Sequence, residues 1–122
     1  MTNEERAHKV LVGSDYIALA TMGGDGRPWA VIVGKKAYES GKLTWVSMAD
    51  TDHSKAIALN NNVAVTVWVG TETVKMHATA REVSCEESGL AQYEAIMTDA
   101  KYGAVDRTNH WLEIEKLMQI ES

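Results

Sequence analysis

The segment SMADTDHSKAIALNNNVAV, residues 47–65, is the most informative part of this chain. It runs from the end of an expected strand, through a polar loop, into a short helix and then into another strand. The loop at residues 51–55 (TDHSK) brings two hydroxyls, an imidazole and an ammonium to the start of that helix. A helix N-terminus favours phosphate because it presents unpaired backbone N–H groups and a partial positive charge. We therefore expect the loop to hold the phosphate end of a cofactor, with a full charge from Lys55 and neutral donors from Thr51 and Ser54.

The composition is that of one globular domain spanning residues 1–122. Hydrophobic residues make up 45% and charged residues 24%, which argues against a disordered chain. The net charge of −5 argues against a nucleic-acid or anionic-membrane partner. No apolar run approaches the ~18 residues that span a bilayer, and the charged N-terminus lacks the apolar region of a signal peptide. The single Cys85 forms no internal disulfide, so we expect a soluble cytoplasmic protein.

Ahead of the opening segment, the sequence predicts a helix followed by an antiparallel meander. Thr2 and Glu5 form a capping box, and Gly13 ends the helix that they begin. Turn sequences then separate three apolar runs. We expect these runs to be strands, at Tyr16–Met22, Pro28–Ala37 and Leu43–Met48.

Behind the polar loop, a short helix is expected at Ala56–Asn60. Two further strands are expected at Val63–Val69, which is rich in β-branched residues, and at Thr73–Val83. Five antiparallel strands joined by tight turns, with helices at their flanks, indicate a small closed or partly closed barrel.

The last third of the chain is predicted to contain a second long helix. Residues 84–87 (SCEE) form another capping box, and Gly103 would end the helix after about Lys101. Four apolar residues follow helical spacing, namely Leu90, Tyr93, Met97 and Ala100. Residues 109–120 fit a strand and a helix equally well.

The order of these features resembles the FMN-binding split-barrel superfamily, also called the pyridoxamine-phosphate-oxidase-like family. The first strand ends in Ala-Thr (residues 18–21, ALAT), and the turn at residues 25–28 reads Asp-Gly-Arg-Pro. Ser54-Lys55 is followed by Leu59 four residues after the lysine and by Asn62 seven residues after it. Most members continue as Asn-Pro-X-Val, whereas this chain reads NVAV at residues 62–65 and replaces the proline. The resemblance covers residues 10–83 best.

The resemblance implies a mainly β fold, a six-stranded antiparallel split β-barrel with flanking α-helices. The last segment of such proteins is commonly a strand that completes the barrel. On that basis Trp111–Ile120 is interpreted as the sixth strand.

The resemblance also implies FMN, bound at the subunit interface of a homodimer. Ser54 and Lys55 would contact the phosphate, with His53 or Thr51 assisting. The second strand would line the isoalloxazine ring, the end of the third would lie near the ribityl chain, and an aromatic near the partner's C-terminus would lie beside the flavin. The implied cofactor-binding residues are Ala30, Val31, Ile32, Val33, Ser47, Met48, Thr51, His53, Ser54, Lys55 and Trp111.

Other interpretations of these residues exist. Without the family, Lys55 is a solvated lysine at a helix start, and the tryptophans are core or dimer contacts rather than flavin-stacking groups. The histidines and Cys85 show no paired ligand spacing, so no metal site is expected. No serine or cysteine lies in a nucleophile elbow or triad pattern.

The leading functional hypothesis is an FMN-dependent oxidoreductase of unknown small-molecule substrate, with quinones or nitro compounds as candidates. Flavin chemistry is supplied by the cofactor, so no catalytic residue is assigned. The acidic tail LEIEKLMQIES differs from the basic C-terminus of true pyridoxamine-phosphate oxidases, so we expect no efficient oxidation of pyridoxine phosphate. The alternatives are a non-enzymatic flavin store or electron carrier, a deazaflavin- or haem-binding protein, and an oligonucleotide-binding barrel. The last would need a basic groove with interleaved aromatics.

Overall fold

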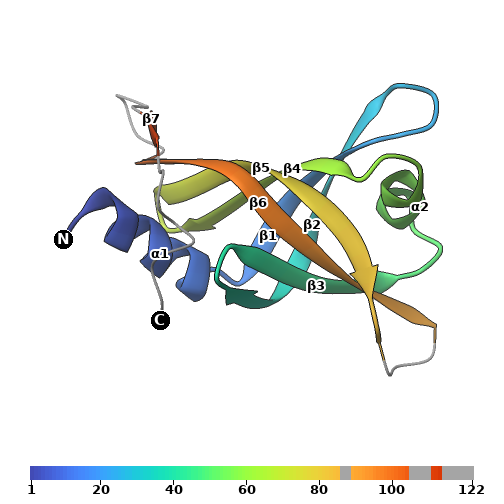
Figure 1. Ribbon diagram of the computed structural model, residues 1–122, viewed down its shortest axis with the longest axis horizontal. Helices are drawn as coiled ribbons and strands as arrows, with labels where there is room; N and C mark the ends of the chain where they lie inside the picture. Colours follow the sequence, from blue (N-terminus) through green and yellow to red (C-terminus); the bar gives the residue numbers. More distant parts are fainter. Residues whose placement is uncertain (86–88, 105–110, 114–122) are drawn as a thin grey trace.

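The computed structural model describes residues 1–85, 89–104 and, for the backbone alone, 111–113. The helices of these residues are α1 (Asn3–Gly13) and α2 (Asp52–Leu59). The strands are β1 (Tyr16–Met22), β2 (Pro28–Glu39), β3 (Lys42–Met48), β4 (Asn62–Val69), β5 (Glu72–Val83), β6 (Leu90–Ala104) and β7 (Trp111–Glu113). Figure 1 shows α1 and β7 at one end of the molecule and α2 at the other.

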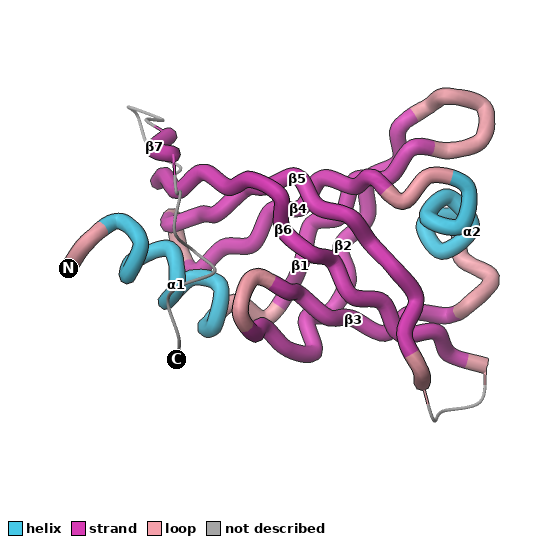
Figure 2. Tube along the Cα trace, in the orientation of Figure 1, coloured by secondary structure: helices cyan, strands magenta, loops and turns pink. Residues whose placement is uncertain are grey.

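The strands form one antiparallel sheet that closes on itself (Figures 1 and 2). Their order is β3-β2-β1-β4-β5-β6-β7, and an additional pairing of β3 with β6 joins the two ends of the six-stranded part. The first half of β6 pairs with β3, and its last residues pair with β7. The prediction of a six-stranded antiparallel barrel with flanking helices is confirmed.

Alternating side chains fill the barrel. On β1 and β4 every second residue is buried, as strands with one face toward a core require. The largest fully buried side chains are Trp45, Leu11, Ile17, Leu19, Leu43, Val10, Val65, Val67 and Val74. Trp45 of β3 thus belongs to the core, as one of the two sequence interpretations expected.

Helix α1 is fixed at both of its ends. Thr2 and Glu5 form the predicted capping box, in which each side chain bonds the other residue's backbone N–H. At the other end the Lys35 ammonium of β2 donates to the carbonyls of Leu11 and Val12, both at 2.7 Å. A cation at the C-terminal carbonyls stabilises the helix and ties it to the barrel.

Residues 90–104 form a strand, so the prediction of a helix there is wrong. Ala91, Tyr93, Ala95 and Met97 are buried in strict alternation, and the segment pairs with β3 and β5 on its two sides. A β-bulge after Met97 shifts the phase, so that Ala100 is the next buried residue. The spacing of four from Tyr93 to Met97 is two strand repeats, and the spacing of three from Met97 to Ala100 is one repeat plus the bulge. Together they imitate the helical pattern, whereas Leu90 is out of phase with the buried residues of the strand.

The expected sixth strand at Trp111–Ile120 is the seventh, because β6 already completes the barrel. Residues 111–113 pair with β6 as β7, and residues 114–120 lie outside the described part of the chain. Residues 86 and 87 of the second predicted capping box also lie outside it. Helix α2 begins at Asp52, four residues earlier than expected, because Thr51 caps it.

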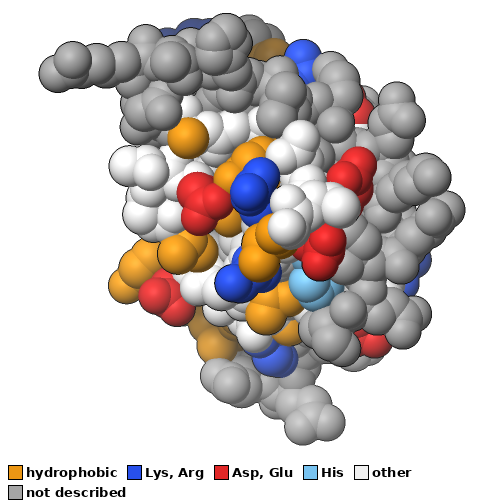
Figure 3. Space-filling view, turned by 90° about the vertical axis from the view of Figure 1, so that its left-hand side faces the viewer, with side chains coloured by type: hydrophobic (Ala, Val, Ile, Leu, Met, Phe, Trp, Pro, Cys, Tyr) orange, Lys and Arg blue, Asp and Glu red, His pale blue; other side chains and the backbone are white. Residues whose placement is uncertain are grey.

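The surface at the end of the barrel that carries α1 and β7 is mixed in character. Figure 3 shows lysine or arginine, acidic and hydrophobic side chains interspersed on the described part of this face. Neither α1 nor α2 is long and apolar enough to span a membrane, and this holds for all helices of the described residues.

Candidate functional site

The loop between β3 and α2 is closed by the side chain of Thr51. Its hydroxyl accepts a hydrogen bond from the backbone N–H of Ser54 at 3.2 Å, which is the N-cap interaction. The same oxygen lies 3.1 Å from the carbonyl of Met48, the last residue of β3. One side chain therefore fixes the angle between the strand and the helix.

His53 continues this network into the barrel wall. Its Nε2 lies 2.9 Å from the Ser47 hydroxyl on β3 and 3.2 Å from that of Thr51. Burial lowers the pKa of the imidazole, against the smaller opposing effect of the neighbouring Asp52 carboxylate. His53 is therefore a neutral partner that holds the loop against β3.

The hydroxyl of Ser54 also points into the loop. Ser54 is only 3% exposed, and its hydroxyl donates to the Met48 carbonyl at 3.1 Å and lies 2.8 Å from the Thr51 oxygen. The structure thus brings together Ser47, Thr51, His53 and Ser54, but as an internal network. A direct contact of these hydroxyls with phosphate stays a prediction.

A cavity of about 500 Å³ lies between this loop and β2. Trp29, Ala30 and Val31 form its strand side, and residues 50–53 form its loop side. Of the four β2 residues predicted to line a flavin, Ala30 and Val31 reach this cavity. Ile32 faces solvent and Val33 faces the core, because successive strand residues point to opposite sides.

Lys55 lies in an adjoining hollow of about 210 Å³, between α2 and the β1–β2 turn. Its other lining residues are Gly23, Gly24, Asp25, Trp29, Asp52, Ala56 and Leu59. Trp29 and Asp52 line both spaces, so the two hollows adjoin, and together they are called the trough. A Cβ atom at Gly23 would lie 3.0 Å from the indole nitrogen of Trp29, so the glycine allows this close packing.

The charges of the trough are mixed. Lys55 is the one cation among the lining residues, which also include the carboxylates of Asp25, Asp50 and Asp52. Asp25 is paired with the Arg27 guanidinium at 2.7 Å, and hydrogen bonds from the Arg27 backbone and side chain lower the pKa of that carboxyl. Asp50 and Asp52 therefore oppose the attraction of Lys55 for an anion.

Several residues of the trough were not assigned to the site from the sequence. Trp29, which was interpreted as a core or dimer contact, is exposed and lines both hollows. Asp50 and Asp52 alternate in the sequence with Thr51 and His53, which were predicted to bind the cofactor. This alternation was the sequence signal that could have assigned the two carboxylates to the site.

Of the two remaining predicted site residues, Met48 contributes its backbone carbonyl to the loop network, while its side chain is exposed at the end of β3. Trp111 begins β7, which pairs with residues 101–103 of β6 at the opposite end of the barrel from α2 (Figure 1). Within one chain, Trp111 is therefore far from the trough.

The comparisons with known proteins show one family from the sequence and one fold from solved structures. The pyridoxamine 5'-phosphate oxidase family matches residues 4–120 of the chain. Among curated proteins, none has a matching sequence.

Solved structures with the same fold include proteins of different properties. A heme binding protein from Mycobacterium smegmatis has a TM-score of 0.84 at 12% identity, over 100% of this chain and 62% of that one. A Clostridium acetobutylicum protein related to general stress protein 26, of the pyridoxinephosphate oxidase family, has a TM-score of 0.76 at 9% identity, over 96% and 99%. PhzG from Burkholderia lata, in complex with tetrahydrophenazine-1-carboxylic acid, has a TM-score of 0.68 at 8% identity, over 83% and 75%. At such identities these likenesses establish the fold alone.

Proposed function

The chain belongs to the pyridoxamine 5'-phosphate oxidase family, and on this premise we propose that it is an FMN-binding flavoprotein. The observation that carries the proposal is the trough along β2 and α2, which joins an apolar wall to a lysine at a helix N-terminus. FMN has a flat ring at one end and a phosphate at the other end of its ribityl chain. The ring matches the apolar wall of the trough, and the phosphate matches the lysine.

The apolar end fits the flavin ring. Trp29, Ala30 and Val31 offer one indole and small side chains along a cavity of about 500 Å³, which is within the usual range for small-molecule sites. A planar ring can lie along this wall of β2.

The phosphate end fits less completely. Lys55 supplies one full positive charge, and the N-terminal turn of α2 adds the partial charge of its backbone N–H groups. The carboxylates of Asp50 and Asp52 weaken this attraction for a phosphate dianion. We therefore expect FMN to bind, but less tightly than it would beside a purely basic loop.

The chain's own residues would bind and orient the cofactor. FMN, when bound, supplies hydride and electron transfer, and this needs no acid or base from the protein. Lys55 would hold the phosphate, and the network of Ser47, Thr51, His53 and Ser54 would keep the loop in place. Trp29 would shield one side of the ring from water.

We further propose that a second copy of the chain covers the trough in a homodimer. Two large apolar side chains that line it are exposed, Trp29 and Leu59. Leu59 is 73% exposed, and exposed apolar surface beside a pocket is typical of an interaction site. Because Trp111 lies at the far end of its own barrel, it could approach a flavin only in the partner's site.

The experiment that tests the proposal is a visible spectrum of the purified protein, before and after addition of FMN. Flavin bands near ~450 nm that stay with the protein through gel filtration would support it. A colourless protein that retains no added FMN would overturn it. Repeated NAD(P)H-driven reduction of a quinone or nitro acceptor by the loaded protein would favour an oxidoreductase over an electron carrier or flavin store.

A second candidate is haem binding, which the Mycobacterium smegmatis structure supports by its name and its TM-score of 0.84. A Soret band after addition of haem, without retention of FMN, would select this alternative. A deazaflavin would be identified by its own absorption after incubation with the cofactor.

A further inference from the structure

The outer wall of the barrel has an apolar face on β2, β1 and β4. Successive strand residues point to opposite sides, so Ile17 and Leu19 of β1 fill the core while Ala18 and Ala20 point outward. The strand pairing places these two alanines in register with outward residues of β2 and β4. We call the resulting set the alanine face; its two rows are Ile32, Ala18 and Thr66, and Ala30, Ala20 and Ala64.

The absence of charge on this face is unusual. The outward residues of an antiparallel sheet that has one face in water are normally polar. Charged residues make up 24% of the chain, yet β1, β4 and residues 28–34 of β2, all of them described by the structure, contain none. Ile32 is 57% exposed, and Ala30 is also exposed. An exposed apolar face of this kind marks an interaction site.

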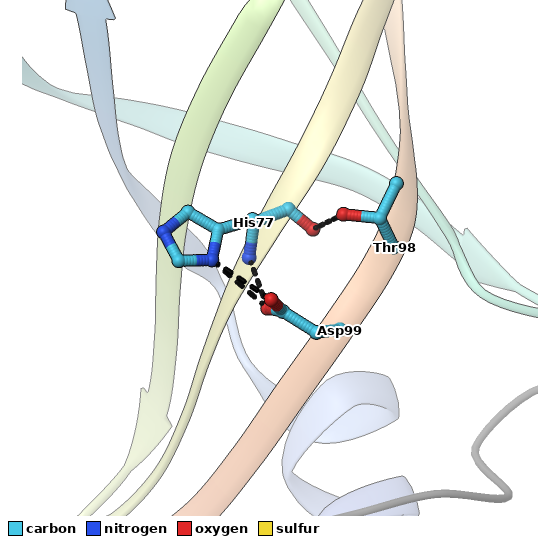
Figure 4. Close-up of polar contacts among 3 residues, drawn as sticks. All are labelled: His77, Thr98 and Asp99. Atoms are coloured by element: carbon cyan, nitrogen blue, oxygen red, sulfur yellow. Dashed lines mark hydrogen bonds and ion pairs between the residues drawn. The ribbon is translucent and has the colours of Figure 1, made fainter.

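A polar row on β5 and β6 bounds the alanine face. His77 stands opposite Ala64 on one side and opposite Asp99 on the other. Figure 4 shows how the polar groups of this row bond one another: the His77 N–H donates to the Asp99 carboxylate at 2.9 Å, and the Thr98 hydroxyl donates to the His77 carbonyl at 3.1 Å. The Asp99 oxygens also lie 2.9 and 3.1 Å from Nδ1 of His77. Such a row suits the hydrated rim of an interface, whose core is apolar.

The alanine face has the size of an interface core. Three strands and about six residues per strand give a face about 14 Å wide and about 20 Å long, which is about 300 Å² in plan. A stable dimer buries about 800 Å² of each partner. The remaining area would come from the two flanks of the face, which are the trough beyond β2 and the polar row beyond β4.

A second copy of the chain is the occupant that fits this face. A peptide helix docks into a groove, whereas the methyl groups of Ala18, Ala20 and Ala64 form a wall without deep holes. Such a wall packs well against another sheet, and a second copy brings one with the same dimensions and chemistry. A two-fold axis then places the same patch of each copy in contact.

The alanine face is also continuous with the trough. Ala30 belongs to the face and lines the cavity between β2 and the α2 loop. A partner that packs on the face therefore reaches the open side of the trough. One partner can cover both surfaces.

We propose that the alanine face is the two-fold interface between two copies of the chain, packed sheet against sheet. This inference rests on the homodimer proposed above and names its contact surface. Because the face consists of the protein's own apolar residues, the interface forms with or without a flavin in the trough.

The first test is the oligomeric state of the cofactor-free protein, measured by sedimentation velocity from about 100 μM down to about 1 μM. We expect a dimer for the unchanged protein. Ala20→Lys and Ile32→Lys each place an ammonium group in the apolar core of both copies, and should raise the dissociation constant at least about a hundredfold. Gln92→Lys is the matched control, because residue 92 points outward from β6, across the barrel from β1. Circular dichroism confirms that each variant is folded.

The second test locates the contact directly by NMR of alanine methyl groups with a soluble gadolinium chelate. The methyl groups of Ala18, Ala20 and Ala64 should be relaxed weakly in the unchanged protein and strongly in Ile32→Lys. Ala37, which is exposed on β2 beyond the paired rows, should be relaxed equally in both proteins.

Three results would overturn the inference: an unchanged protein that is monomeric at about 100 μM; a dimer that Ala20→Lys and Ile32→Lys weaken no more than Gln92→Lys does; or alanine methyl groups that are relaxed equally in the unchanged protein and in Ile32→Lys. Added FMN separates this inference from the flavoprotein proposal. A dimer that depends on Ile32 but retains no FMN supports the interface and overturns only the flavin, whereas a monomer that retains FMN overturns only the interface.

Discussion

Trp45 of β3 and Tyr93 of β6 stand directly opposite each other and stack, with ring centroids 5.6 Å apart and planes inclined by 20°. Trp45 is fully buried and Tyr93 nearly so. The pair lies at the pairing of β3 with β6, which turns an open sheet into a barrel. Aromatic stacking adds to the stabilisation from the buried area of both rings.

Tyr93→Ala should therefore destabilise the protein strongly. Removal of a buried aromatic side chain costs about 3–5 kcal/mol because a cavity replaces it. Urea unfolding followed by tryptophan fluorescence would show a large fall in the midpoint. Gln92→Ala, at the neighbouring outward-facing position, should cost far less, and equal losses in both variants would contradict the importance of the pair.

Lys55→Ala should lower the affinity for FMN at least tenfold, about 1.4 kcal/mol. The reason is loss of the one ammonium group among the residues that line the trough. Fluorescence quenching of added FMN gives the dissociation constant. Lys9→Ala is the matched control, and similar affinities in both variants would exclude Lys55 as the phosphate ligand.

Asp52→Asn should raise the affinity for FMN by about twofold to tenfold, because a carboxylate is removed from both hollows of the trough. The same change should lower stability by about 0.3–1 kcal/mol, since Asp52 lies in the first turn of α2 and favours its dipole. Titration with FMN and urea unfolding measure the two effects. Asp15→Asn serves as a control, and an unchanged or lower affinity of Asp52→Asn would show that the phosphate binds elsewhere.

Thr51→Ala should cost about 0.5–2 kcal/mol of stability, as expected for loss of an N-cap side chain. Thr51→Ser keeps the oxygen that accepts from Ser54 and should restore most of this loss. Thermal unfolding of the three proteins provides the comparison. If serine and alanine had the same effect, the hydroxyl network would not hold the loop.

The stability of the protein should fall on acidification because of His53. Burial lowers its pKa, so the unfolded state binds the proton more readily. The contribution of His53 is fully present above the unfolded pKa of about 6.5 and is lost as the pH falls through the folded pKa. His53→Gln keeps a polar partner for Ser47 but cannot titrate. Its urea midpoint should therefore depend less on pH, between about 7.5 and 5.5, than that of the unchanged protein, and identical slopes would contradict this role.

The strands that could be predicted are those with one regular period. Ile17 and Leu19 of β1, and Val63, Val65 and Val67 of β4, alternate with outward residues from end to end, and these strands lie within one residue of their expected bounds. In β6 the bulge breaks the period after Met97, and no sequence pattern distinguishes such a break from a helix. Only the pairing with β3 and β5, which is a long-range property, determines the strand.

The position of the polar loop could be predicted from the sequence, but its contacts could not. The TDHSK sequence located the loop at the N-terminus of α2, where the trough lies. The inward direction of the Ser54 hydroxyl depends on the Met48 carbonyl, and the role of Trp29 depends on its packing against Gly23. Both are contacts between elements, so the local sequence does not contain them.

The closure of the barrel by β3 and β6 also determines when the protein can mature during synthesis. The outer edge of β3 has no partner until the ribosome has delivered residues 90–96, long after β3 itself has emerged. An exposed strand edge invites pairing with other nascent chains, so this interval is the period of greatest risk of aggregation. The loop that begins α2 follows the end of β3 directly. A cofactor that recognises the complete trough would therefore bind only after β6 has paired with β3, when the period of greatest aggregation risk is over.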